Sequence, residues 1–140
     1  MGSLYDWICP KCGFSIFERS GIGLSSRYQG MTIRQKALSG NGYPELKELF
    51  EQYPNDGEVM KVHGLFQCPV CKQIKQSECI DFKQRNAGEP HPFFQGLRLP
   101  KLVKRFYPIC DKCGVDMDSE ILTCPHCGTE LNAQNVGCWD

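Results

Sequence analysis

Residues 9–13 are Cys-Pro-Lys-Cys-Gly and residues 124–128 are Cys-Pro-His-Cys-Gly, and this arrangement of two thiols across a tight turn decides the fold. Four Cys-x-x-Cys pairs occur among the 140 residues. In chain order they are Cys9/Cys12, Cys68/Cys71, Cys110/Cys113 and Cys124/Cys127. A disulfide between positions i and i+3 closes little loop entropy, whereas two thiolates at this spacing can bind one metal ion together. The spacing therefore predicts that these eight cysteines are metal ligands.

The residues around the cysteines have the turn chemistry that a metal site needs. Proline follows the first cysteine in three of the pairs and fixes one backbone angle there. Glycine follows the second cysteine in three pairs, where a positive φ lets backbone amides point at sulfur. The exception is Lys72, which makes the second turn the least regular. Four thiolates in a tetrahedral array suit Zn²⁺, so eight thiolates predict two Zn²⁺ ions per chain.

Loop lengths indicate which pairs share a metal ion. Only ten residues separate Cys113 from Cys124, the length of a short hairpin, so we expect the third and fourth pairs to form one site. The first and second pairs then form the other site, with 55 residues looped out between them. Each doubling of such a loop costs only about 0.6 kcal/mol, far less than a structural zinc site contributes. An interleaved arrangement is the alternative, because the linker is long enough to permit it.

Residues 9–13 and 124–128 resemble the knuckles of zinc-ribbon proteins and, more distantly, those of rubredoxins. The order of a Cys-Pro-x-Cys-Gly knuckle, Gly21-Ile22-Gly23, a short acidic helix and a second Cys-Pro-x-Cys also resembles small uncharacterised bacterial zinc-ribbon proteins. The resemblance covers roughly residues 1–20, 64–82 and 104–132. It implies structural zinc in a ribbon fold and supplies no reaction.

The expected fold is a small α+β protein stabilised by metal, with two zinc-ribbon-like β modules and a helical insert in the first. The predicted divisions are a zinc ribbon over 1–82 with its insert at 21–67, a linker containing proline and glycine over 83–100, and a C-terminal zinc ribbon over 101–140. Strands are expected over 4–8, 14–17, 58–67 and 74–82.

Two helices are expected inside the insert. Pro44 suits a first helical turn, and the apolar residues up to Tyr53 recur on one face that should be buried. These apolar residues are Leu46, Leu49, Phe50 and Tyr53. A weaker helix is predicted to begin at Thr32, where Thr32 and Gln35 fit a capping box.

Composition excludes several classes of protein. Sixteen Lys and Arg balance sixteen Asp and Glu, which argues against a uniformly basic nucleic-acid binder. No run approaches the ~18 apolar residues of a membrane span, and the N-terminal residues do not have the pattern of a signal peptide. We therefore expect no membrane contact and a cytoplasmic protein, in a compartment where thiols stay reduced and bind metal.

A zinc ion with four cysteine ligands has no position open for water, and the sequence has none of the common catalytic motifs. We therefore expect no enzyme activity and no catalytic residue. The predicted function is a non-catalytic adaptor or binding module whose partner is a protein. A rubredoxin-like iron electron carrier is an alternative, because tetrahedral sulfur ligation suits iron as well as zinc.

Residues 91–109 suggest a second alternative, a zinc-ribbon protein that binds nucleic acid. Four cations alternate with aromatic residues there, as phosphate contact and base stacking require. The cations are Arg98, Lys101, Lys104 and Arg105. The favoured interpretation is intramolecular: the aromatic side chains pack on the ribbons, and the cations meet the acidic residues of 110–140. Of the two remaining cysteines, Cys79 is expected to be buried, and Cys138 could be an exposed thiol.

Overall fold

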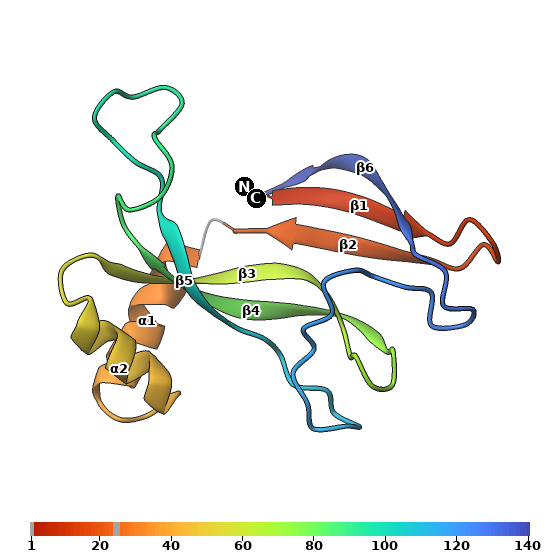
Figure 1. Cartoon of the computed structure of the whole chain (residues 1–140), viewed down its shortest axis with the longest axis horizontal. Coiled ribbons are helices and arrows are strands. Elements are labelled where there is room, and N and C mark those ends of the chain that lie inside the picture. The colour runs from red at the N-terminus through yellow and green to blue at the C-terminus, as the bar shows by residue number, and fades with distance from the viewer. Residues whose placement is uncertain (1, 24–25) are drawn as a thin grey trace. The chain divides into compact units, whose positions relative to one another are not determined.

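The computed structural model describes residues 2–23 and 26–140, with the side chains of residues 26 and 27 left out. Its elements are β1 (Gly2–Ile8), β2 (Ser15–Gly21), α1 (Ser26–Leu38), α2 (Pro44–Gln52), β3 (Gly57–Gln67), β4 (Ile74–Gln84), β5 (Lys101–Phe106) and β6 (Asn132–Trp139). The strands form one antiparallel sheet in the order β5-β4-β3-β2-β1-β6 (Figure 1). The predicted small α+β class is therefore confirmed. Neither described helix has the length and apolar character needed to cross a membrane.

The chain divides into two compact units, each built from separated segments. Unit 1 comprises Met1–Leu24, Val62–Cys79 and Tyr107–Asp140, and unit 2 comprises Ser25–Lys61 and Ile80–Phe106. These units do not coincide with the predicted divisions at residues 82 and 100. Both helices belong to unit 2, whereas every residue of the four Cys-x-x-Cys pairs belongs to unit 1.

The core of unit 2 forms where α2 packs on β4. The helix begins at Pro44, as predicted, and Leu46 and Phe50 are buried. The ring of Phe50 meets the fully buried ring of Phe82 edge-on, with 5.0 Å between the centroids. Leu49 and Tyr53 pack against the same cluster. The predicted apolar face of this helix is thus part of a core.

The first helix begins earlier than the sequence predicts. α1 runs from Ser26, so Thr32 lies inside the helix and does not cap it. Its hydroxyl donates to the carbonyl of Tyr28, 3.2 Å away, which is the bond expected of a threonine within a helix. Gly30 brings the helix against β3, because a Cβ there would clash with the carbonyl oxygen of Val59. The predicted capping box was therefore wrong.

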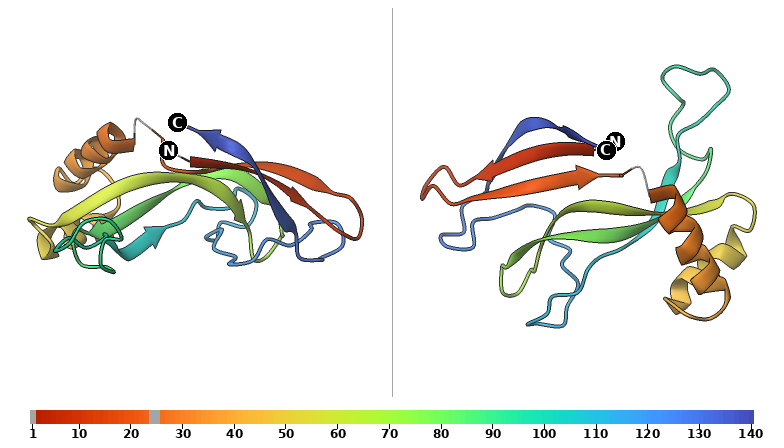
Figure 2. Two further views of the ribbon diagram at one scale, coloured as in Figure 1. Left: turned by 90° about the horizontal axis from the view of Figure 1, so that it is seen from above. Right: turned by 180° about the vertical axis from the view of Figure 1, so that it is seen from behind.

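In unit 1, hydrogen-bonded turns that contain cysteines connect paired strands. β1 pairs with β2 over its whole length, and the first Cys-x-x-Cys pair lies in the turn between them. The second pair lies between β3 and β4. β6 runs beside the other edge of β1 (Figure 2).

Gln67, at the end of β3, connects two parts of unit 1 that are distant in sequence. Its amide nitrogen donates to the carbonyls of Lys72 and Thr123, both 2.9 Å away. Its amide oxygen accepts from the backbone N–H of Thr123 at 2.9 Å and lies 3.3 Å from that residue's hydroxyl. The side chain is 1% exposed, so these bonds form away from water. Gln67 therefore joins the turn that follows Cys68 to the backbone of Thr123, directly before Cys124.

Replacement of Gln67 by leucine should destabilise the protein strongly. The Gln67→Leu variant removes the partner of one backbone N–H and two carbonyls at a partly buried place, at a cost of about 2–4 kcal/mol. Thermal unfolding of the metal-loaded protein measures the loss. Gln76→Leu is the matched control: Gln76 makes two 2.9 Å bonds to the backbone of Arg19, but it is exposed, and water can replace them. Equal losses in the two variants would contradict the role of Gln67.

Candidate metal centres

Each Cys-x-x-Cys pair lies in a turn with the same two backbone hydrogen bonds. We number these turns along the chain as knuckles 1 to 4, beginning at Cys9, Cys68, Cys110 and Cys124. The N–H of the first cysteine donates to the carbonyl five residues on, at 2.7 to 3.0 Å. The N–H of the residue after the second cysteine donates back to the carbonyl of the first, at 2.8 to 3.1 Å. The common pattern shows that all four turns present their thiols in the same way.

The residue after the second cysteine adopts a left-handed backbone in every knuckle. Gly13, Gly114 and Gly128 have φ values of 78°, 68° and 77°. Lys72 has a φ of 66°, although a side chain disfavours this region. Knuckle 2 therefore has the same backbone geometry as the other three knuckles, although lysine replaces the glycine.

The eight thiols form two groups that join the knuckles in a nested order. Cluster A contains Cys9, Cys12, Cys124 and Cys127, from knuckles 1 and 4. Cluster B contains Cys68, Cys71, Cys110 and Cys113, from knuckles 2 and 3. Within each cluster the sulfur atoms lie within 4.8 Å of one another. The predicted pairing of neighbouring knuckles was therefore wrong, although all eight predicted ligands belong to a cluster.

The short segment between knuckles 3 and 4 explains the nested order. Each of these knuckles closes its own small hairpin, with bridges between Ile109 and Asp116 and between Thr123 and Glu130. The segment between the hairpins is therefore a connection from one cluster to the other. Ser119 in this segment donates its N–H to the carbonyl of Gln67 at 3.4 Å. Ten residues are enough for this connection, and they do not form the expected hairpin.

The sulfur atoms are spaced as the ligands of one tetrahedral metal ion would be. In cluster A the Cys9–Cys127 and Cys12–Cys124 pairs are 3.5 Å apart, and the Cys12–Cys127 pair is 3.9 Å apart. In cluster B, Cys71 and Cys110 are 3.6 Å apart. A tetrahedron with metal–sulfur bonds of about 2.3 Å has edges of about 3.8 Å. Four sulfurs would fill such a shell and leave no position for water.

One cysteine of each knuckle is buried and the other is more exposed. The first cysteine is at most 2% exposed in all four knuckles. The second cysteine is exposed in knuckles 1, 2 and 4 and half-buried in knuckle 3. Cys9 and Cys124 belong to an apolar cluster with Leu65, Leu122 and Leu131. The buried thiols are therefore part of the core of unit 1 as well as candidate ligands.

Hydrogen-bond donors near the sulfur lower the pKa of two of the thiols. The Thr129 hydroxyl, 3.3 Å from Sγ, lowers the pKa of Cys127 to about 6 because it can donate to the thiolate. Burial opposes the thiolate of Cys68, but the amides of Cys71 and Val70 lie 3.4 Å from its Sγ, and its pKa is lowered to about 6.

Other thiols in the two clusters resist ionisation. Burial and the neighbouring sulfurs raise the pKa of Cys113 to about 12. The amide of Phe14 favours the Cys12 thiolate, but the surrounding sulfurs, first that of Cys124, raise the pKa of Cys12 to about 12. Four crowded thiols therefore need a cation before all can ionise. A metal ion would displace the remaining protons, so its affinity would decrease as the pH falls.

The other predicted residues lie outside the clusters. Cys79 is 1% exposed, as expected, and the thiol of Cys138 is exposed on β6. His126 is exposed in knuckle 4, and its ring contacts that of Phe14 from knuckle 1, with 5.2 Å between the centroids. Sequence reasoning missed Gln67 and Thr129. Thr129 directly follows Cys127-Gly128 in knuckle 4, and this position next to the turn is the sequence signal for a hydroxyl near sulfur.

The four predicted nucleic-acid-binding cations lie in unit 2, and three contact other groups of that unit. Arg105 forms two bonds with the buried carboxylate of Asp81, at 2.6 and 2.8 Å. Lys104 pairs with Glu45, and the guanidinium of Arg98 donates to the carbonyl of Gly88 at 3.1 Å. Lys101 is exposed. The expectation that the cations pair with acidic residues of 110–140 was wrong for Lys104 and Arg105.

Residues 86–100, predicted as a linker, form an ordered loop in unit 2. Three backbone bonds of 2.8 Å cross it, and the N–H of Arg98 donates to the side chain of Asn86 at 2.6 Å. At its tip the N–H of Phe93 donates to the ring of His91 at 3.1 Å. Phe93 is nevertheless 85% exposed and Phe94 60% exposed. We call residues 86–100 the aromatic loop.

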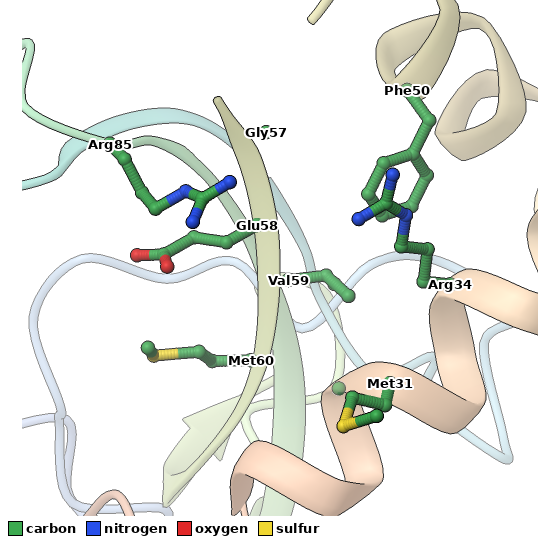
Figure 3. Close-up of a pocket in the computed structure, with 9 residues that line it drawn as sticks. Met31, Arg34, Phe50, Gly57, Glu58, Val59, Met60 and Arg85 are labelled. Atoms are coloured by element: carbon green, nitrogen blue, oxygen red, sulfur yellow. The ribbon is translucent and has the colours of Figure 1, made fainter. Parts of the chain in front are cut away.

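A hollow of about 290 Å³ in unit 2 is lined by residues of α1, α2 and β3 and by Arg85. In Figure 3 the guanidinium of Arg34 lies over the ring of Phe50, and Arg85 and Glu58 point toward one another beside β3. Met31 and Val59 form an apolar part of its wall. None of its lining residues is a cysteine, histidine or serine. The two cysteine clusters are therefore the candidate functional sites with the most specific chemistry.

Comparison of the chain with protein-family models, with curated proteins and with solved structures finds no match in any of the three. Metal binding is therefore inferred from the geometry of the two clusters.

Double variants distinguish the nested order from the sequential one. If knuckles 1 and 4 share a metal ion, Cys9→Ser/Cys124→Ser damages one site and keeps one metal ion per chain. Cys9→Ser/Cys68→Ser damages both sites and keeps none. Native mass spectrometry of the two proteins counts the ions. Sequential pairing predicts the reverse result for the two variants, so each serves as the control for the other.

Proposed function

We propose that the protein is a non-catalytic binding module held together by two structural Zn²⁺ ions, one in each cysteine cluster. The observation that carries this proposal is the closed set of four sulfurs in each cluster. Such a shell leaves the metal no open position for a substrate or an activated water. The buried cysteines also lie within the apolar clusters of unit 1, so the metal ions would act on folding.

Zinc is favoured over iron, and a simple measurement separates them. The rubredoxin-like alternative requires iron in the same tetrahedral sulfur shell. An iron–thiolate protein is red, whereas a zinc protein is colourless. The presence of two clusters in a chain with a separate helical unit favours a structural role, because one metal ion is enough for a minimal electron carrier.

Metal content and metal removal test the structural role. The purified protein should be colourless and contain two zinc ions per chain by native mass spectrometry, because eight thiolates fill two tetrahedral shells. A chelator should then unfold unit 1, since the metal supplies folding free energy there. Near-ultraviolet circular dichroism and fluorescence of Trp7, which lies in β1 before knuckle 1, report this change. An unchanged spectrum after verified zinc removal would contradict the structural role.

The partner is proposed to be a protein that contacts the aromatic loop. Two exposed phenylalanines in a loop with internal hydrogen bonds are preorganised, so binding them costs little conformational entropy. Aromatic side chains of this kind are frequent anchors of protein interfaces. Unit 2 contains 11 basic and 7 acidic residues, which favours a partner with an apolar pocket in an acidic surface.

Affinity capture from the native host tests this surface. Zinc-loaded wild-type protein should retain a partner that Phe93→Ser/Phe94→Ser loses, because the variant removes the two anchors. Both residues are exposed, so the melting temperature of the variant should be unchanged. A variant with Phe17→Ser, an exposed phenylalanine on β2, is the matched control and should retain the partner. Equal retention by all three proteins would contradict a role for the aromatic loop.

Binding of nucleic acid through residues 91–109 is the second candidate, and the surplus of basic residues in unit 2 supports it. The ion pairs of Lys104 and Arg105 count against it, because each cation is already partly neutralised. Arg105 faces a carboxylate with a side-chain exposure of 2%, which makes its role in the fold the stronger one.

The two ion pairs should respond differently to alanine. Arg105→Ala leaves the buried carboxylate of Asp81 without its arginine and should cost about 3 kcal/mol. Lys104→Ala removes an exposed pair and should cost less than about 1 kcal/mol. Thermal melting measures both losses of stability.

Fluorescence anisotropy with a labelled single-stranded oligonucleotide should show no binding at low salt. Salt-dependent binding that both variants weaken would favour the nucleic-acid alternative.

A further inference from the structure

The outer edge of β6 lacks the features that normally prevent strand pairing. β6 pairs with β1 alone among the described strands and forms one edge of the sheet. Residues 132–138 are all exposed. An edge strand presents unpaired N–H and C=O groups, and natural proteins usually protect it with charged residues or proline. The sequence of β6, Asn-Ala-Gln-Asn-Val-Gly-Cys-Trp, contains neither.

The opposite edge of the same sheet provides an internal comparison. Three of the six residues of β5 are basic. A second copy of β5 would place like charges across the new pair, which is unfavourable. No such repulsion arises between two copies of β6. The two edges therefore differ in the property that controls strand addition.

Both ends of β6 are held in place, so the strand would lose little conformational freedom on pairing. At one end Leu131 is buried, and its N–H donates to the carbonyl of Leu122 at 3.0 Å. At the other end the indole N–H of Trp139 donates to the carbonyl of Ser20 at 2.9 Å. The guanidinium of Arg19 lies 4.3 Å from the centre of the Trp139 ring. Such preorganisation reduces the entropy cost of association.

We propose that β6 is a self-association surface on which a second copy of this chain pairs its own β6 in antiparallel orientation. Antiparallel pairing about a two-fold axis gives a closed dimer with one continuous sheet. The bulge in the β1–β6 pairing, opposite Leu4 and Tyr5, leaves Asn132–Asn135 as the regular run. Side chains alternate between the two faces of a strand, and opposed residues must share a face, so the two-fold axis sets one residue opposite its own copy. Gln134 would then lie opposite Gln134 of the second copy, and Ala133 opposite Asn135.

The composition of the run explains why a second copy fits this edge. Its side chains are uncharged, and three of the four are amides, each of which can donate and accept hydrogen bonds across the new pair. A strand pair of this length makes a small interface, so the dimer should be weak. Unit 1 contains 9 acidic and 5 basic residues, so two copies repel at long range. Salt should therefore strengthen the dimer.

Sedimentation equilibrium of the zinc-loaded protein, from low to high micromolar concentration, tests the association. The wild-type protein should shift from monomer to dimer, and more so when sodium chloride is raised. Gln134→Lys should lose the dimer because it places a charge at the proposed two-fold axis. The fold should tolerate this change, since Gln134 lies opposite Asp6 on β1. Gln35→Lys, the same change on the exposed surface of α1, should dimerise like the wild type.

The exposed thiol of Cys138 allows the register to be measured. A spin label on Cys138 of the zinc-loaded protein should give a distance of about 26 Å between the two copies, since eight residues separate these positions along the paired strands. The Cys138→Ser protein controls for labelling elsewhere. A protein that stays monomeric overturns the proposal. So does a dimer that Gln134→Lys leaves intact, or a distance that excludes antiparallel β6 pairing.

Discussion

A Cys-x-x-Cys turn supplies only two of the four ligands of a tetrahedral metal site. The fold of unit 1 depends on which second turn supplies the other two. Two strand hairpins carry knuckles 1 and 2, and two small hairpins of the last segment carry knuckles 4 and 3. The nested union of these halves brings three separated stretches of chain into one unit. The apolar clusters of unit 1 include Cys9 and Cys124 in one case and Cys68 and Cys110 in the other. Metal binding by these clusters would therefore be coupled to core formation in this part of the protein.

The choice between nested and sequential order is made by short-range contacts. Loop closure favours the sequential order, but its dependence on length is logarithmic, and the difference here is only about 1–2 kcal/mol. The bonds of Gln67 outweigh that difference, because in the nested order its amide bonds both the turn after Cys68 and the backbone of Thr123 before Cys124. A single buried side chain thus ties cluster B to cluster A.

The same energies explain which features could be predicted from the sequence and which could not. All eight predicted ligands lie in the two clusters, and α2 and strands β3 and β4 were predicted correctly, because knuckle spacing and apolar periodicity are local signals. The pairing of the knuckles was predicted wrongly, because loop length was used where its energy is too small to decide. The bonds of Gln67 have no pattern in the sequence, since a glutamine at the end of a strand looks like any exposed polar residue. In the Gly21-Ile22-Gly23 run, Gly21 ends β2, and Gly23 leaves room for the ring of Trp139.

The order of residues along the chain does not predict how charge is distributed between the two units. The chain is neutral, but unit 1 has a surplus of four acidic residues and unit 2 a surplus of four basic ones. The basic run that suggested a nucleic-acid site contributes two of its cations to ion pairs with Glu45 and Asp81 in its own unit. Four thiolates around one Zn²⁺ add two negative charges, so metal loading would make unit 1 more acidic still. Pairing of two copies through unit 1 therefore has to work against like charge, whereas unit 2 can combine an exposed aromatic tip with attraction of acidic partners.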